Sequence, residues 1–318
     1  MKTAAIAVAL AATAVNALPH EKRENDSGEI NAPGEYILQN RACQLHQDDF
    51  TNAGLPDFAR GRFEEIGKHE QSHVDVLSSV LGDSATQACE YNFPVTDPAS
   101  FAALSQVLEG VGVSAYAGAA QYLTSKDALT AAAVILSTEA RHAAWVASAI
   151  SLENPWSGAY DTPLTFNEVY SLASAFIVSC PDSNPALPFK AFPVLTLGTG
   201  KPGESVSVTY ANATSSDEAD DQTEDDSTED DTSEDASSED DSSEDNSSNG
   251  EDFYVAFFSG MDKTFVQVID GMVTIPEGLK GTVYAVATTN DTAATDDTTV
   301  AGPAILAFPY GPDGDLLD

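Results

Sequence analysis

The stretch that decides the fold is FEEIGKHEQSHVDVL, residues 63–77. One face of a helix over this stretch consists of Phe63, Ile66, Glu70, His73 and Leu77, which are three or four positions apart. The other members of this face are apolar, so Glu70 and His73 belong to its buried stripe. The sequence therefore predicts a helix over residues 58–81 that carries an acid and an imidazole into a hydrophobic core.

The same pattern occurs again in ILSTEARHAAWV, residues 135–146. Its stripe is Ile135, Glu139, His142, Val146 and Ala149. Between the two stretches, Glu109 shares a helix face with Val113, Tyr116 and Ala120. Three glutamates and two histidines on inward faces would be costly to bury without a common partner. Two Glu-x-x-His pairs with a further glutamate have the spacing by which a helical bundle holds two iron or manganese ions.

The expected helices cover 34–50, 58–81, 98–122, 126–152 and 164–178. Asp97-Pro98 is a good start for the third helix, and Thr165 with Glu168 forms a capping box on the fifth. Short links join helices one and two, and helices three and four, whereas the link from two to three is long. Two antiparallel hairpins joined by a crossover make a four-helix bundle, with the fifth helix added to it. We assign the bundle to residues 34–180.

Residues 181–310 change to short strand patterns separated by Gly, Pro, Asp or Asn, followed by a tail at 311–318. The expected strands are 192–197, 205–210, 253–258, 264–269, 282–287 and 304–308. They favour a small antiparallel β-sandwich, which makes the chain an α+β multidomain protein. An acidic repeat at 215–252 interrupts this region and has no aromatic or large aliphatic residue, so we expect it to be disordered.

The N-terminus has the features of a targeting segment. Lys2 precedes an apolar run that is too short to span a bilayer, and small residues suited to cleavage end at Ala17. We expect a signal peptide at 1–17 and a mobile leader or propeptide at 18–33, in which Lys22-Arg23 is either a dibasic processing site or an ordinary exposed pair. Export would make the sequons at Asn25, Asn212, Asn246 and Asn290 glycosylation sites.

Three cysteines are present, and an oxidising compartment favours one disulfide among them. Cys89 and Cys180 lie in loop-like contexts, whereas Cys43 falls inside an expected helix. We therefore predict that Cys89 pairs with Cys180 and that Cys43 is a small buried side chain.

The formal net charge of −38 at pH 7 argues against nucleic acid or an anionic membrane surface as a partner. After the N-terminal segment, no apolar run is long enough to cross a membrane. The expected location is extracellular.

Residues 34–180 resemble the ferritin-like superfamily, and more narrowly the secreted fungal ferritin-like proteins of the late sexual development or stress-response type. The matching pieces are EIGKHEQSH at 65–73, ACEYNF at 88–93, LEGVGVSAY at 108–116 and EARH at 139–142. The C-terminal strands are similar to the β-domain appended in those relatives. The resemblance implies Glu70, His73, Glu109, Glu139 and His142 as metal ligands, an extracellular or cell-wall location, and wall or matrix components as partners.

The first helix departs from the family pattern. The family shows Leu-Glu-x-Leu-Glu, whereas this chain has Gln44 and Gln47 at the corresponding places. Gln44 is the better counterpart of Glu109, but an amide brings no charge and bridges two ions poorly. Three states therefore remain open: two bound ions, one ion near Glu139, His142 and Glu109, or no metal.

Two functions from different classes follow. The first is a secreted binding or structural protein of development or stress with a full or degenerate metal–carboxylate site, and the loss of first-helix carboxylates favours it. The second is an iron or manganese oxidoreductase acting as an oxidase, a ferroxidase or a peroxide-handling enzyme. No catalytic residue is assigned. His69 and His46 are expected at the rim and in solvent, respectively.

Overall fold

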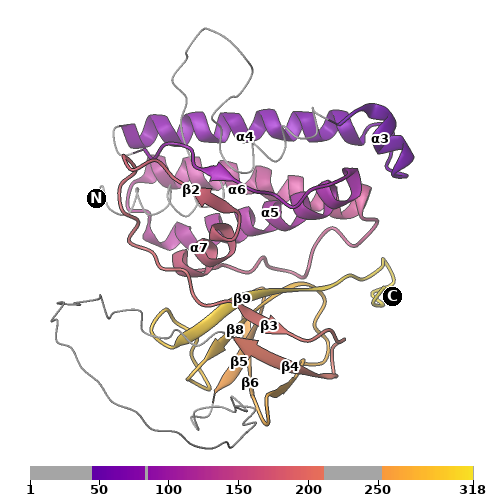
Figure 1. Cartoon of the computed structure of the whole chain (residues 1–318), viewed down its shortest axis with the longest axis vertical. Coiled ribbons are helices and arrows are strands. Elements are labelled where there is room, and N and C mark those ends of the chain that lie inside the picture. The colour runs from indigo at the N-terminus through magenta and orange to yellow at the C-terminus, as the bar shows by residue number, and fades with distance from the viewer. Residues whose placement is uncertain (1–44, 83–84, 211–252, 318) are drawn as a thin grey trace, which may run out of the picture.

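The computed structural model describes residues 45–82, 85–210 and 253–317. The signal segment, the leader, Lys22-Arg23, Cys43, Gln44, the sequons at Asn25, Asn212 and Asn246, and the acidic repeat lie outside these ranges. The helices lie on one side of the molecule and the two larger antiparallel sheets lie on the other, so the class is α+β (Figure 1). No described helix has both the length and the apolar character that a membrane crossing requires.

Three long helices dominate the helical layer: α4 (Ala59–Leu81), α5 (Pro98–Ala119) and α6 (Lys126–Trp145). Local signals fix where two of them begin. Asp97 accepts a hydrogen bond from the amide of Ser100 at the start of α5, and Ser125 accepts one from the amide of Ala128 at the start of α6. These bounds agree with the periodicity of the sequence. A 3-10 turn, η2 (Ala120–Tyr122), follows α5, and a π-helix, η3 (Val146–Ile150), continues α6.

The expected helix at 34–50 is wrong at its C-terminal end. His46 has an extended backbone (ψ 157°) and precedes a helix of six residues, α3 (Gln47–Asn52). The amide of His46 donates to the Asp49 carboxylate at 2.7 Å, so this short helix has a start of its own. Continuous helix through His46 is therefore excluded.

The fifth helix is shorter than expected. Thr165 and Glu168 form the predicted capping box on α7 (Phe166–Ser174). The chain then leaves the helix, and β2 (Ile177–Ser179) pairs antiparallel with β1 (Glu90–Tyr91). Backbone pairing with the loop after α4 thus replaces the last helical turn that the pattern predicted.

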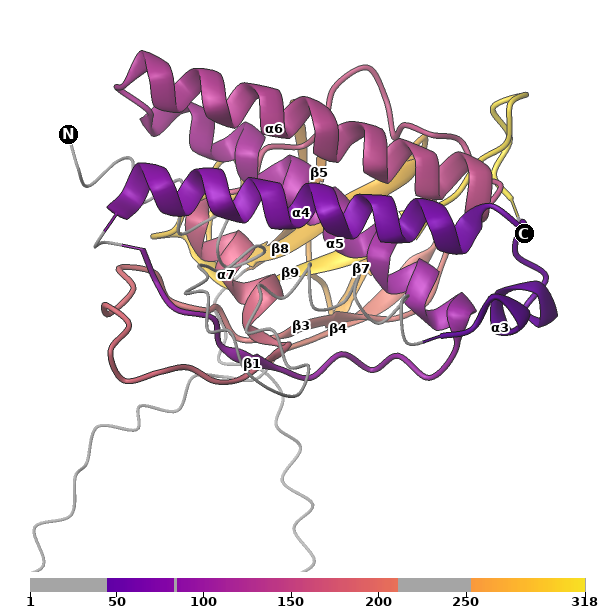
Figure 2. The same ribbon diagram turned by 90° about the horizontal axis from the view of Figure 1, so that it is seen from above.

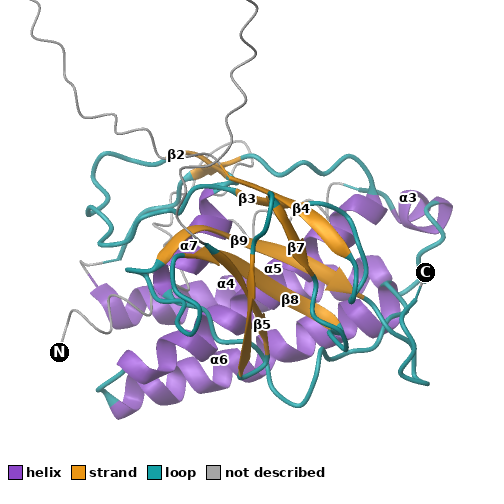
Figure 3. Cartoon of the chain, turned by 90° about the horizontal axis from the view of Figure 1, so that it is seen from below, coloured by secondary structure: helices purple, strands orange, loops and turns teal. Residues whose placement is uncertain are grey.

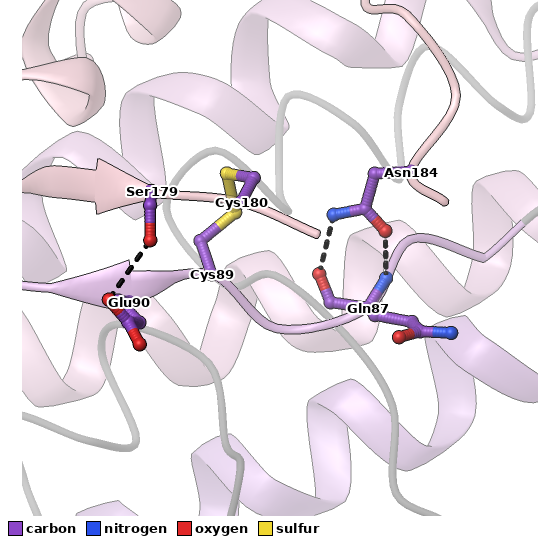
Figure 4. Close-up of a disulfide and its surroundings, with 6 residues drawn as sticks. All are labelled: Gln87, Cys89, Glu90, Ser179, Cys180 and Asn184. Carbon is purple, nitrogen blue, oxygen red and sulfur yellow. Dashed lines mark hydrogen bonds between the residues drawn. A yellow bond between two sulfur atoms is a disulfide. The ribbon is translucent and has the colours of Figure 1, made fainter. Parts of the chain in front are cut away.

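A disulfide joins Cys89 to Cys180 beside this two-stranded sheet (Figure 4). Ser179 donates a hydrogen bond to the Glu90 carboxylate at 2.9 Å, and the Asn184 side chain bonds the backbone of Gln87 through both its oxygen and its nitrogen. Together these contacts fasten the segment after α7 to the connection between α4 and α5. The pairing agrees with the loop contexts of the two cysteines.

Two larger sheets follow. One has the strand order β3 (Leu195–Leu197), β4 (Ser205–Tyr210), β7 (Met272–Thr274). The other has the order β6 (Asp262–Gln267), β5 (Tyr254–Ser259), β8 (Gly281–Thr288), β9 (Thr299–Phe308). All pairings are antiparallel. The expected strands are present, β4 with the predicted bounds and the others with shifted ends, and β7 was not predicted.

The four-stranded sheet is buried on both faces. Phe257 and Val283 pack toward the three-stranded sheet in a core that also contains Val206 and Val273. Their neighbours Phe258 and Tyr284 point the other way and pack against α5 and α7. Figures 2 and 3 show the long helices lying across this sheet. Helix α5 therefore lies between α4 and α6 on one side and the sheet on the other.

Candidate metal centre

Five predicted side chains from three helices meet in the helical layer. Glu70 and His73 come from α4, Glu109 from α5, and Glu139 and His142 from α6. Nδ1 of His142 lies 3.1 Å from Glu109 Oε2 and 3.2 Å from Glu70 Oε1. Nδ1 of His73 lies 3.0 Å from Glu139 Oε1 and 3.3 Å from Glu70 Oε2. The acids and imidazoles are thus interleaved in one cluster.

The cluster is buried. The three glutamates have 0% exposed surface, and His73 and His142 are 8% and 6% exposed. Their helical neighbours in the predicted stripes, such as Phe63, Ile66, Leu77 and Ile135, are buried as well. Charged groups removed from water at such depth are stable only when they are paired, protonated or bound to a cation.

Protons partly neutralise the cluster. Burial opposes charge on His73, but the carboxylates of Glu139 and Glu70 beside its Nδ1 outweigh burial and raise the pKa of His73 to about 10. Burial, with repulsion from Glu70, raises the pKa of Glu139. Burial also acts against charge on Glu70, yet hydrogen bonds from His142 and His73 hold the pKa of Glu70 below its ordinary value. The site therefore combines a low-pKa carboxylate, a protonated imidazole and an acid that resists ionisation.

The donor set fits a metal ion. Glu70, Glu109, Glu139 and His142 each offer a ligand atom, and these atoms lie within 4.8 Å of one another. Although Glu139 Oε1 is close to His73, neither Glu139 oxygen receives a well-aligned hydrogen bond. Carboxylate oxygens with imidazole nitrogen suit iron, manganese or zinc. His73 lies outside the group of four, and its ring centroid is 6.3 Å from that of His142.

One contact of the cluster was not predicted from the sequence. His69 is exposed, as its rim position predicted, but its Nδ1 lies 3.0 Å from His142 Nε2, and the two rings lie edge to edge with an interplanar angle of 10°. Burial and the neighbouring His142 lower the pKa of His69. His69 precedes Glu70 and lies one turn before His73. In the sequence, this spacing was the only indication that His69 could belong to the cluster. His46, expected in solvent, is exposed.

An apolar cavity of about 250 Å³ lies elsewhere, between α5, α7 and β9. Its lining includes Val111, Ala173, Phe176 and Ile305, with Ser171 as the polar exception. None of the five cluster residues lines it, so the cavity is separate from the candidate metal centre.

Residues 39–152 match the family model described as a ferritin-like domain. The matched range contains α4, α5 and α6 and all five clustered residues. The match supports placing the helical part in the ferritin-like superfamily, as its sequence pieces indicated.

The chain is also similar to a protein of the fission yeast Schizosaccharomyces pombe named Protein rds1. The two are 27% identical over 191 residues, which cover 54% of this chain and 47% of the relative. The chain thus matches about half of the length of this curated relative.

Proposed function

We propose that the helical part of this chain is a metal-binding ferritin-like domain that holds iron or manganese, as one ion or two, at Glu70, Glu109, Glu139 and His142, with His73 beside them. The observation that carries the proposal is the convergence of three fully buried glutamates from three helices on two histidines. A divalent cation would add positive charge beside carboxylates that, without it, have the protonated His73 as their cationic neighbour.

The three glutamates would have two roles at the metal site. Glu70 is central, because its two oxygens face different histidines: Oε1 lies 3.2 Å from His142 and Oε2 lies 3.3 Å from His73. Glu109 and Glu139 flank it and would complete an anionic oxygen set around a cation. A bound iron or manganese ion would supply Lewis acidity and, at open positions, redox chemistry. The surrounding apolar stripes keep bulk water away from the carboxylates.

The architecture proposed around this site is a four-helix bundle over residues 34–180, with a β-sandwich over 181–310. Helices α4, α5 and α6 supply three members of the bundle, and the fourth would come from the chain before His46. That segment includes Gln44, the proposed additional weak ligand. The two sheets that share the core of Phe257 and Val283 support the sandwich.

We further propose that the protein is exported and acts as a binding or structural factor in development or stress. The disulfide between Cys89 and Cys180 supports an oxidising location, because such bonds are rare in the cytosol. Asn290 lies in a turn in which its side-chain oxygen accepts hydrogen bonds from Thr292 and Ala293, a setting suited to a surface glycan. The development or stress role rests on the family resemblance.

Metal analysis of protein purified without chelators tests the proposal. We expect between one and two ions of iron or manganese per chain, and E139A should lose most of this metal while remaining folded. A content below about 0.2 ion per chain, even after incubation with Fe²⁺ or Mn²⁺, would contradict a preformed site. E153A is a matched control, since Glu153 also lies on the helical side of the molecule but outside the cluster.

A further inference from the structure

His142 has a neighbour at each of its ring nitrogens. Nδ1 faces the carboxylates, at 3.1 Å from Glu109 Oε2, and Nε2 faces His69 Nδ1 at 3.0 Å. The His69 and His142 rings are nearly parallel, with centroids 5.2 Å apart. The contact joins two helices, because His69 belongs to α4 and His142 to α6. It also joins an exposed residue to a buried one.

This geometry limits which form of His142 can bind a cation. A neutral imidazole carries one N–H, and the other nitrogen has the free lone pair. Only Nδ1 faces the carboxylates, so a cation held by those carboxylates would use the lone pair of Nδ1. The proton must then be on Nε2, where His69 Nδ1 is the acceptor within hydrogen-bond distance.

We propose that His69 is a positioning residue for the metal centre: its Nδ1 accepts a hydrogen bond from Nε2–H of His142, which selects the tautomer and fixes the ring orientation that present Nδ1 of His142 to the ion. The inference rests on the proposed function and adds to it. His69 takes the place that a carboxylate or carbonyl usually has behind a ligating histidine. The two rings are nearly coplanar and lie edge to edge, which aligns Nε2 of His142 with Nδ1 of His69 as a hydrogen bond requires.

Three variants separate the hydrogen bond from the space that the His69 ring fills. H69F keeps a flat ring against His142 but removes the acceptor, whereas H69N offers a side-chain oxygen near the position of Nδ1 and removes the ring. H46F is the matched control, because His46 is an exposed histidine outside the cluster. Each variant is made in the full chain, freed of metal, and titrated with Mn²⁺ in competition with a chelator of known affinity. Urea unfolding of each metal-free variant checks that it is folded.

We expect H69F to bind Mn²⁺ at least about tenfold more weakly than wild type, because partners behind a ligand contribute roughly 10–100-fold to affinity. H69N should recover most of the loss, and H46F should match wild type. In metal-loaded wild type, with Zn²⁺ as a diamagnetic probe, NMR should detect a coupling across the hydrogen bond between the His69 and His142 ring nitrogens.

Two negative results have different meanings. If wild type binds Mn²⁺ and H69F binds it equally well, the positioning role is wrong while the metal site stands. If wild type itself binds neither Mn²⁺ nor Zn²⁺, the proposed function fails and this inference fails with it. A loss in H69F that H69N does not reduce would also overturn the inference, because it would assign the effect to the ring rather than to the acceptor.

Discussion

The core between the two sheets and the interior of the helical part bury different kinds of side chain. Between the sheets, the clustered side chains are all apolar, from Leu195 to Phe308. Among the helices, aromatic and aliphatic side chains surround three glutamates with no exposed surface. In the described strands, by contrast, the buried polar residues are two threonines, Thr288 and Thr299.

This difference distinguishes apolar burial, which stabilises the fold, from carboxylate burial, which the proposed metal site requires. Apolar burial contributes about 25 cal/mol per Å² of area removed from water. Burying a carboxylate opposes folding unless a partner compensates for it. Leucine at the three glutamate positions could fill the same space between the helices. Packing alone therefore does not explain why carboxylates are buried there. We therefore expect the two interiors to respond oppositely to mutation and to metal.

The largest expected effect comes from the sheet core. Phe257 is 1% exposed, and F257A should lower the free energy of unfolding by about 3–5 kcal/mol, because it removes a buried ring and leaves a cavity. Metal bound per folded molecule should not change. Urea unfolding followed by circular dichroism measures the first quantity, and metal analysis of the folded fraction measures the second. A fall in metal bound per folded molecule that accompanies the loss of stability would mean that the two interiors are not independent.

E139Q should show the opposite behaviour. It removes the anionic ligand but keeps the size of the side chain, so Mn²⁺ affinity should fall by more than about 100-fold, beyond the loss caused by partners behind a ligand. Burial already raises the pKa of Glu139 and favours its uncharged form, so metal-free stability should change by less than about 1 kcal/mol. A large loss of metal-free stability would instead assign Glu139 a structural role.

The boundary between the two regions can be tested at Gly118 in α5. A methyl group there would lie 1.8 Å from the backbone oxygen of Leu164, so G118A must displace the chain and should cost about 1–3 kcal/mol. G110A in the same helix is the matched control, because its added methyl group meets nothing within 4 Å. G110A should be neutral or stabilise the helix by about 0.5–1 kcal/mol. Similar effects of the two substitutions would contradict the close packing of α5 against the backbone of Leu164.

The smallest effect concerns Glu168, which lies between the helices and the sheet. Burial raises its pKa despite a hydrogen bond from the Thr165 amide. An acid whose pKa is higher in the folded state favours folding most below its unfolded pKa, and this contribution is lost as the pH rises through the folded pKa. E168Q should therefore gain stability relative to wild type between pH 4 and pH 7.5, by about 1 kcal/mol or less. A constant difference across this range would show that Glu168 titrates normally.

Much of the helical site could be predicted because its signal is local. Apolar residues at helical spacing determine which face is buried, and Glu70, His73, Glu139 and His142 lie on those faces. The contact between His69 and His142 could not be predicted, because it depends on how closely α4 and α6 approach. The extensive burial of the second half of α5, residues 108–119, also depends on the sheet, which packs on Val111 and Ala115.

The sheets show a similar limit. Alternating apolar residues predicted most strands, but a segment of three residues such as β7 is too short to show a period. The order of strands within each sheet depends on contacts between distant segments. The helix expected at 34–50 was predicted from its overall pattern, which gave too little weight to one local signal. Asp49 accepts a hydrogen bond from the amide of His46, and this cap starts α3 as a separate helix.

Anomalous diffraction from crystals of protein purified without chelators and soaked in Mn²⁺ would show whether the buried cluster holds a metal ion. We predict a manganese peak within bonding distance of the Glu70, Glu109, Glu139 and His142 side chains, with Nδ1 of His142 pointing at it. Peaks confined to the molecular surface, with the four side chains still arranged around an interior that holds no manganese, would contradict the account.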